Sequence, residues 1–157
     1  MVDRVLPGER AAASEADAER LIGLWRLLSF REQASDGSWT DAMGPDPSGY
    51  IGYWPQGHMS VLIGSARRPR FNGAWAAIAA EEKARALDGL VAYAGRYRYE
   101  PGRIVHEVEV CWIPNWQGRE LVRIPTFLDD DRLLLRTPDT GAAGRSRPQE
   151  VEWQRVS

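Results

Sequence analysis

The stretch Gly23-Leu24-Trp25-Arg26-Leu27 opens the folded part of the chain, and Val151-Glu152-Trp153-Gln154-Arg155 closes it. The residues between them read as short strands separated by turns, which predicts a sheet whose first and last strands meet. In such a sheet the Arg155 guanidinium lies over the Trp25 indole, a cation–π contact that plugs one end of a barrel. Because a small closed barrel usually works through its interior, this pattern predicts an interior pocket.

Eight strands are expected from runs of alternating apolar and polar residues bounded by turn signals. Two hairpins are clearest, one turning at Pro55-Gln56-Gly57 and the other at Glu100-Pro101-Gly102. The expected strands are residues 25–33, 50–54, 58–63, 92–100, 103–112, 119–128, 132–137 and 150–156. This number of short antiparallel strands suits a small barrel.

The N-terminal region is expected to contain little structure. Residues 1–13 show no packing face and are expected to be a flexible tail. Residues 14–20 are expected to form a short helix, with Ser14 as its N-cap. Glu15 and Asp17 fall in its first turn, where the helix dipole favours acidic groups.

One internal segment departs from the strand pattern. Residues 73–87 are rich in alanine, which predicts a helix that Asn72 caps and that Gly89 ends in the left-handed conformation. We expect this inserted helix to cover one mouth of the barrel. Residues 137–148 are expected to form a long mobile loop.

The chain totals limit the class of protein. A length of 157 residues fits one domain, expected over residues 14–157, and a formal net charge of −2 gives no electrostatic reason for a nucleic-acid or anionic-membrane partner. Cys111 is the only cysteine, so no intramolecular disulfide forms and a reducing compartment is indicated. The sequence shows no secretory signal and no run of roughly 20 apolar residues. We therefore expect a cytoplasmic protein.

Short motifs along most of the chain carry a family resemblance. They are Gly23-Leu24-Trp25-Arg26-Leu27, Gly49-Tyr50-Ile51-Gly52-Tyr53, Gly57-His58-Met59-Ser60, Tyr93-Ala94-Gly95-Arg96-Tyr97, Val105-His106-Glu107-Val108, Pro114-Asn115-Trp116-Gln117-Gly118, Arg123, Leu133-Leu134-Leu135 and Trp153-Gln154-Arg155. In this order and spacing the chain resembles the lipocalin-like domain family, small intracellular β-barrel proteins of bacteria and fungi that often accompany natural-product biosynthesis.

The resemblance implies an all-β fold, an antiparallel barrel of eight to ten strands with an interior ligand cavity. Together with the helices expected above, this gives a barrel with a short N-terminal helix and one inserted helix. The resemblance does not imply one chemistry, because family members include binding proteins as well as cofactor-free cyclases and isomerases. Function must therefore be argued from the residues of the site.

Alternation along two neighbouring strands selects the residues that face the interior. Charged side chains on one face of each strand are cheaper to leave in water, so the aromatic faces are expected to point inward. The inward residues are expected to be Tyr93, Gly95, Tyr97 and Tyr99 on the first strand, and His106, Val108, Val110 and Trp112 on the second.

His106 and Arg123 are the candidate catalytic residues. An imidazole titrates near neutral pH, which suits His106 to general acid–base catalysis. The strand pattern leaves the direction of Arg123 open, whereas its place in the family motif favours the cavity. There it would supply a positive charge for a carboxylate, enolate or phenolate oxygen. The alternative is that both side chains only satisfy each other and nearby tyrosines inside a polar-lined core.

The candidate ligand-binding residues are aromatic groups and a second histidine. Tyrosine hydroxyls can orient a ligand by hydrogen bonds, and tryptophan rings supply flat apolar walls. His58 follows a turn and either reaches the barrel mouth or is solvated. The set is Tyr53, His58, Tyr97, Tyr99, Trp112 and Trp116.

The sequence predicts neither a metal nor a cofactor. The histidines lie far apart in the chain, and nucleotide-binding and serine-hydrolase motifs do not occur. Cys111 reads as a packing residue rather than a nucleophile.

Two functions remain open from the sequence. One is a cofactor-free cyclase or isomerase that acts on a hydrophobic natural-product intermediate in the barrel cavity. The other is a non-catalytic carrier or binding protein for a small hydrophobic or aromatic molecule. A homodimer formed through edge contacts or the inserted helix is also left open.

Overall fold

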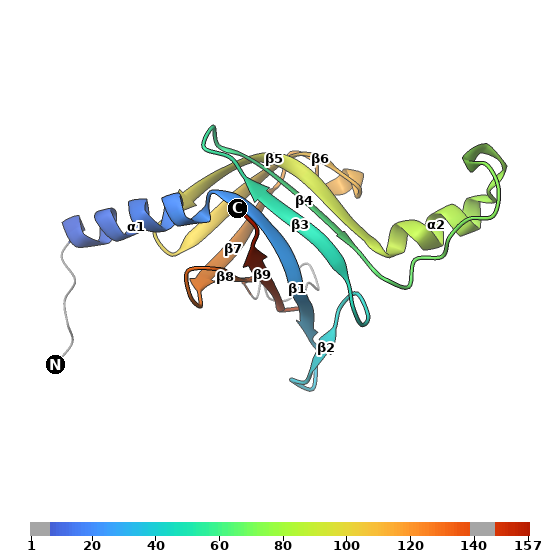
Figure 1. Ribbon diagram of the computed structural model, residues 1–157, viewed down its shortest axis with the longest axis horizontal. Coiled ribbons are helices and arrows are strands. Elements are labelled where there is room, and N and C mark those ends of the chain that lie inside the picture. Colours follow the sequence, from blue (N-terminus) through green and yellow to red (C-terminus); the bar gives the residue numbers. More distant parts are fainter. Residues whose placement is uncertain (1–6, 139–146) are drawn as a thin grey trace.

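Eight antiparallel strands close into a barrel (Figure 1). A ninth, short strand pairs only with the far end of the first strand. The computed structural model describes residues 7–138 and 147–157. The expected all-β barrel is therefore confirmed, as is the meeting of the first and last strands.

Short loops join most of the strands, and each strand pairs with the next around the barrel from β3 to β9. The helical elements are α1 (Pro7–Leu21), η1 (Trp75–Ala77), α2 (Ala80–Asp88) and η2 (Pro114–Trp116). The strands are β1 (Gly23–Gln33), β2 (Trp39–Asp41), β3 (Ser48–Tyr53), β4 (His58–Gly64), β5 (Leu90–Glu100), β6 (Arg103–Cys111), β7 (Glu120–Phe127), β8 (Arg132–Arg136) and β9 (Gln149–Arg155).

The first strand, β1, joins both edges of the barrel. It pairs with β3 through its first half and with β9 along most of its length. Trp25 and Leu27 point into the core, and a bulge after Leu27 turns Phe30 inward three residues later. The short β2, which the sequence pattern did not predict, pairs only with the far end of β1.

The predicted plug is present at one end of the barrel. Trp25 is 0% exposed, and the Arg155 guanidinium carbon lies 4.1 Å from the centre of its ring. Arg155 also donates hydrogen bonds to the carbonyl oxygens of Arg20 and Ile22, while the Trp25 indole N–H donates to the Leu21 carbonyl at 2.9 Å. These contacts satisfy carbonyls that the end of α1 leaves free and attach the helix to the plug.

The N-terminal helix is longer than the sequence pattern predicts. It begins at Pro7, so the backbone of residues 7–13 is helical rather than loose, and Ser14 lies inside the helix instead of capping it. Residues 1–6 lie outside the described part of the chain. No helix in that described part is long and apolar enough to cross a membrane.

The inserted segment is not one continuous helix. A short 3₁₀ turn, η1, precedes α2, whose N-cap is Ala79 and not Asn72. Gly89 has a φ of −89°, so the expected left-handed end is wrong. The segment projects from the barrel beyond the start of β5 (Figure 1), and it contributes no residue to the interior cavity described below. The expected lid over the barrel mouth is therefore also wrong.

A bulge between β5 and β6 sets which side chains face inward. The register shifts at Ala94/Gly95, and a Cβ on Gly95 would collide with the Glu107 carbonyl oxygen. Beyond the bulge the alternation reverses, and Val110 is 61% exposed instead of facing the interior as expected. His106 and Val108, before the bulge, remain buried inside.

The plug yields a test of barrel closure. Arg155→Met should lower the free energy of unfolding by about 1–3 kcal/mol, because it removes the cation–π contact and the donors to two helix-end carbonyls. Arg96→Met, at an exposed position of β5, should change it by less than about 0.5 kcal/mol. Urea unfolding measures both values, and equal effects of the two substitutions would contradict a structural role for the plug.

Candidate functional site

A cavity of about 190 Å³ lies inside the barrel, on the side away from the plug. Its rim is formed by the far end of β1, the loop before β3 and the start of β9. The wall is mainly apolar and contains few polar side chains. The lining residues are Phe30, Glu32, Ala42, Met43, Ile51, Val61, Ile63, Val91, Tyr93, His106, Trp112, Trp116, Arg123, Leu135, Gln149, Val151 and Trp153.

His106 lies between two tyrosines in this wall. Its Nε2 is 2.9 Å from the Tyr53 hydroxyl oxygen and its Nδ1 is 2.8 Å from the Tyr93 hydroxyl oxygen. The imidazole is 0% exposed. Burial, and secondarily the charge of Arg123, hold the pKa of His106 well below its usual value, so the ring is neutral at pH 7.

The hydrogen bonds between His106 and its two tyrosine neighbours favour one tautomer of the imidazole. Among the described residues, the buried Tyr53 hydroxyl has only His106 Nε2 as a hydrogen-bond partner. If Tyr53 donates to Nε2, Nδ1 carries the ring proton and donates to the Tyr93 oxygen. The hydroxyl hydrogen of Tyr93 is then free to point to the cavity. The opposite arrangement would leave the Tyr53 hydrogen buried without an acceptor, which is costly.

Arg123 brings a positive charge to the same place. Its side chain lines the cavity, with one guanidinium nitrogen 2.9 Å from the Val122 carbonyl oxygen and another 3.4 Å from the Tyr93 hydroxyl oxygen. Within the described residues Arg123 forms no ion pair at 4.0 Å or less. The direction that the strand pattern left open is therefore settled by the structure: Arg123 faces the cavity.

Burial and the guanidinium act in opposite directions on Tyr93. Burial raises the pKa of its hydroxyl, while the nearby Arg123 charge and hydrogen bond lower it, and burial prevails. Tyr93 is therefore a neutral donor at pH 7. It stands between the neutral His106 and the charged Arg123, where it can donate to a ligand oxygen.

Two tryptophans and one carboxylate complete the accessible part of the wall. The rings of Trp112 and Trp116 meet edge to face with centroids 5.0 Å apart, and both line the cavity as expected. Glu32 is the one carboxylate in the lining, and its oxygen lies 3.5 Å from an Arg147 nitrogen. The cavity thus presents flat apolar surface, a guanidinium, a phenol and a carboxylate.

Four of the expected ligand-binding residues do not line the cavity. Tyr53 lies behind His106, and its ring packs edge to face with Tyr97 at 5.0 Å. The Tyr97 hydroxyl donates to the Trp54 carbonyl oxygen at 3.0 Å. Burial, with a contribution from Asp17, raises the pKa of Tyr99 to about 12.

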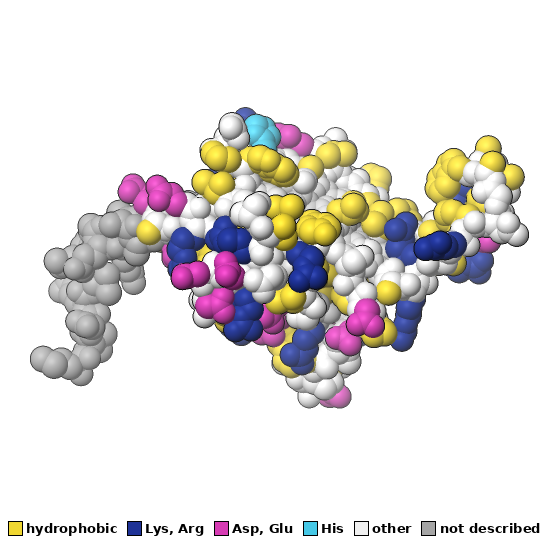
Figure 2. Space-filling model, viewed as in Figure 1, with side chains coloured by type: hydrophobic (Ala, Val, Ile, Leu, Met, Phe, Trp, Pro, Cys, Tyr) yellow, Lys and Arg dark blue, Asp and Glu magenta, His cyan; other side chains and the backbone are white. Residues whose placement is uncertain are grey.

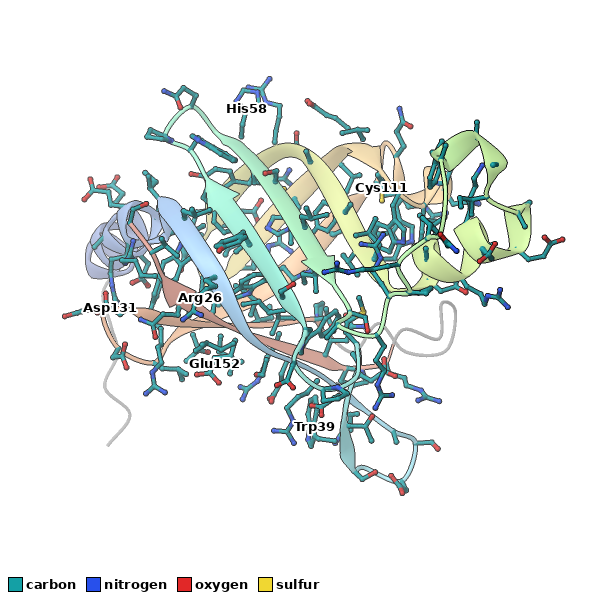
Figure 3. All side chains as sticks on the ribbon, turned by 45° about the vertical axis from the view of Figure 1, so that its right-hand side comes forward. Arg26, Trp39, His58, Cys111, Asp131 and Glu152 are labelled. Atoms are coloured by element: carbon teal, nitrogen blue, oxygen red, sulfur yellow. The ribbon has the colours of Figure 1, made fainter. Side chains whose placement is uncertain are left out.

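His58 is the fourth of these residues. It begins β4 and is exposed at the end of the β3–β4 hairpin (Figure 3). Its place corresponds to the solvated alternative that the sequence left open.

Tyr93 and Trp153 were not predicted as site residues, although both line the cavity. Alternation placed Tyr93 on the same inward face as Tyr97, so that signal was available in the sequence. Trp153 was placed only as part of the final strand. Its role inside the cavity depends on the pairing of β9 with both β1 and β8, which brings it beside Leu27 and Leu133.

A second apolar hollow lies on the outer surface of the barrel. Hydrophobic side chains gather over β3 and β4 (Figure 2), and a groove of about 530 Å³ there contains Tyr50, Trp54 and Leu62 in its wall. None of its lining residues is charged. Of these two hollows the interior cavity is therefore the better candidate site, because charged side chains line it and none lines the outer groove.

The described side chains also bear on metal binding. No group of three or more His, Cys, Asp and Glu residues in that part of the chain is arranged to hold a metal ion. Cys111 is a free, partly buried thiol that packs against the core.

Comparison with solved structures finds other small β-barrels. A redesigned β-barrel aligns with a TM-score of 0.44 and 11% identity, covering 89% of this chain and 95% of that one. A de novo designed fluorescence-activating β-barrel gives 0.41 and 14%, with 88% and 95% covered. A third structure, of a protein bound to DFHBI, gives 0.43 and 12%, again with 88% and 95% covered. A comparison with curated proteins finds no match.

A family model described as a lipocalin-like domain matches residues 22–156. This range begins just before β1 and ends just after β9, so it covers the whole barrel with its plug and its cavity. The closed barrel and its interior cavity are consistent with small-molecule binding. The chain belongs to the lipocalin-like domain family.

Proposed function

We propose that the barrel binds a small, mainly apolar molecule whose oxygen atom accepts hydrogen bonds from Arg123 and Tyr93. The observation that carries this proposal is a guanidinium with no ion-pair partner in the described chain, beside a phenol, in a largely apolar cavity. A charge in such surroundings interacts more strongly with an oxygen than it would in water. A carboxylate, phenolate or polarised carbonyl oxygen suits the pair.

The size of the cavity limits the ligand. An engineered protein cavity of roughly 150 Å³ holds benzene. The cavity here, at about 190 Å³, therefore fits a molecule or part of a molecule with one or two rings. A larger natural-product intermediate would have to extend through the rim.

A second candidate function is a cofactor-free isomerase or cyclase, and the carboxylate of Glu32 in the same cavity favours it. In this proposal Glu32 removes a proton from the carbon beside a ligand carbonyl, and the C–H electrons form a carbon–carbon double bond. The carbonyl π electrons move to oxygen, where Arg123 and Tyr93 stabilise the enolate. If the ligand has a carbon–carbon double bond next to the deprotonated carbon, return of the proton from Glu32 to the far end of that double bond gives an isomer. A ring forms instead when the enolate carbon attacks a second carbonyl carbon of the same molecule. The π electrons of that carbonyl then move to its oxygen, which takes the proton from Glu32.

His106 acts through Tyr93 in both candidate functions. Both of its nitrogens are occupied by tyrosines, so it is a positioning residue rather than the group that takes the substrate proton. Its neutral ring donates to the Tyr93 oxygen and directs the Tyr93 hydrogen into the cavity. The proposed role of His106 therefore differs from the acid–base role that the sequence suggested.

Binding can be tested with 2-naphthoate, a two-ring carboxylate, by isothermal titration calorimetry. Arg123→Gln should weaken binding by about 10–100-fold, because a charge-assisted hydrogen bond in the cavity is lost. Tyr93→Phe should weaken it by about 5–10-fold. Arg96→Gln, on the outer surface of β5, is the matched control. Unchanged affinity in Arg123→Gln would rule out the proposed site.

Catalysis can be tested with 2-tetralone, a two-ring ketone with acidic protons beside its carbonyl. The protein should speed exchange of these protons in deuterium oxide, followed by proton NMR. Glu32→Gln should slow the protein-dependent exchange at least about tenfold, because the amide cannot accept the proton, while 2-naphthoate affinity stays within about twofold. Exchange no faster than in buffer would leave only the binding function.

The buried neutral His106 predicts a pH dependence of stability. Its pKa is lowered on folding, so below about pH 6.5 the unfolded chain takes up a proton that the folded chain does not. This contribution to stability is therefore complete above about pH 6.5 and is lost as the pH falls, by up to about 1.4 kcal/mol per pH unit. Urea unfolding from pH 7 to 5 should show a smaller loss in His106→Gln than in the unchanged protein. Equal losses would contradict the prediction.

A further inference from the structure

An apolar patch covers part of the outer face of the barrel, where hydrophobic side chains gather in Figure 2. No charged side chain lines the groove that it contains. Elsewhere the outer face carries charges in contact with water, such as the ion pairs of Arg98 with Glu107 and Glu120. Five large side chains of the patch are between 37% and 61% exposed, and we name this set the outer patch. They are Leu24, Tyr50, Trp54, Leu62 and Val110.

Strand register arranges the middle of the outer patch as a ridge beside a trough. Tyr50 of β3 and Leu62 of β4 are direct neighbours and form the ridge. Two residues along the strands, Ser60 of β4 and Ala94 of β5 are direct neighbours with short side chains, and they form the trough. Ridge and trough are therefore roughly 7 Å apart on the same face. A surface with this pattern is complementary to itself, because a two-fold rotation about an axis between the two rows places each ridge over the facing trough.

Trp54 continues this surface beside the trough. A Cβ on Gly52 would collide with the Trp54 ring, so the ring lies against the sheet at this glycine instead of projecting from the barrel. Its backbone is held on both sides, since its N–H donates to the His58 carbonyl at 2.9 Å and its carbonyl accepts from the Tyr97 hydroxyl at 3.0 Å. A tryptophan fixed in this way suits packing against another protein surface. A ring that enters a lipid surface would have to project.

The size of the outer patch matches the centre of a dimer interface. A half-exposed side chain of this size leaves on the order of 100 Å² in water, so the five together reach the upper range of the roughly 300–600 Å² typical of the largest apolar patch on a monomer. A standard interface buries roughly 800 Å² per partner, and about two thirds of that area is apolar in homodimers. Arg26 and Arg96 border the patch on β1 and β5 and supply part of a polar rim.

We propose that the outer patch binds a second copy of this chain, with Leu62 of each copy seated in the trough of the other. The contact uses a face of the sheet and not the strand edges or the inserted helix that the sequence left open. It goes beyond the proposed function, because it needs no ligand and uses none of the residues at the rim of the interior cavity.

Sedimentation velocity of the full chain tests this contact. The mass should rise from that of a monomer at about 1 µM toward that of a dimer at about 500 µM. Leu62→Glu should weaken association at least about 100-fold, because each dimer would bury two carboxylates without partners. Leu128→Glu is the matched control, since Leu128 is an exposed leucine in the β7–β8 turn, and it should change association by less than about twofold.

Ser60→Leu tests the fit of the two surfaces separately from their hydrophobicity. The substitution makes the outer patch more apolar but fills the trough that receives Leu62. Association should therefore weaken at least about tenfold. Stronger association in this variant would contradict the two-fold arrangement.

Dilution of the unchanged protein provides a measurement that depends on no variant. In ¹⁵N-labelled protein, backbone amide resonances of β3 and β4 should shift between about 500 and about 10 µM, while those of β7 and β8 should not. Shifts confined to β7 and β8 would place the contact elsewhere and overturn the proposal.

Three further outcomes would also overturn it. One is a chain that remains monomeric at about 500 µM, and another is a dimer that is equally strong in Leu62→Glu. The third is a monomeric chain that sediments with vesicles of phosphatidylcholine and phosphatidylglycerol and loses this binding in Leu62→Glu, which would assign the outer patch to a lipid surface. Arg123→Gln should dimerise like the unchanged protein, so failure of the ligand site and failure of the dimer are distinguishable.

Discussion

The pairing of β1 with β9 is the constraint on which the rest of the structure depends. Without it the sheet would have two open edges and no interior. The Arg155 side chain stabilises this pairing, because it covers the Trp25 ring and also donates hydrogen bonds to carbonyl oxygens at the end of α1. One guanidinium thus connects both ends of the barrel sequence with the helix that precedes it.

The polar groups of the cavity form one connected system. Tyr53 and Tyr93 form hydrogen bonds with the two ring nitrogens of His106. Tyr93 also accepts a hydrogen bond from Arg123. The imidazole remains neutral because burial and the adjacent guanidinium both oppose its protonation. Burying several polar side chains in an apolar wall is costly unless each has a hydrogen-bond partner. Loss of one partner therefore destabilises the neighbouring groups of the network as well. In the proposed function, the remaining donor capacity of Tyr93 and Arg123 is what recognises a ligand oxygen in the cavity.

Membership of the lipocalin-like domain family establishes the fold and is consistent with small-molecule binding, but chemistry depends on where the reactive groups lie. Here the donors are found within the cavity and the carboxylate, Glu32, belongs to the end of β1 at its rim. This separation can orient a ligand with its oxygen inward and a carbon toward the carboxylate. Binding requires only the first contact, whereas proton transfer requires both at once.

Local sequence patterns determined much of the architecture by themselves. Alternation of apolar and polar residues predicted most of the strands, because this signal is carried by residues that are neighbours along the chain. The terminal motifs with Trp25 and Arg155 indicated that the first and last strands meet. The pattern failed at the β5–β6 bulge, where one extra residue turned Val110 outward, and at the inserted segment, which projects from the barrel instead of covering it.

Only the tertiary structure decided the candidate site. The hydrogen-bonded chain from Tyr53 to Arg123 uses residues of β3, β5, β6 and β7, and Trp153 in the cavity wall comes from β9. Which of these side chains meet depends on the register between strands far apart in sequence and on the closure of the sheet. A period of two assigns a residue to a face, but it carries no information about the partner across the barrel.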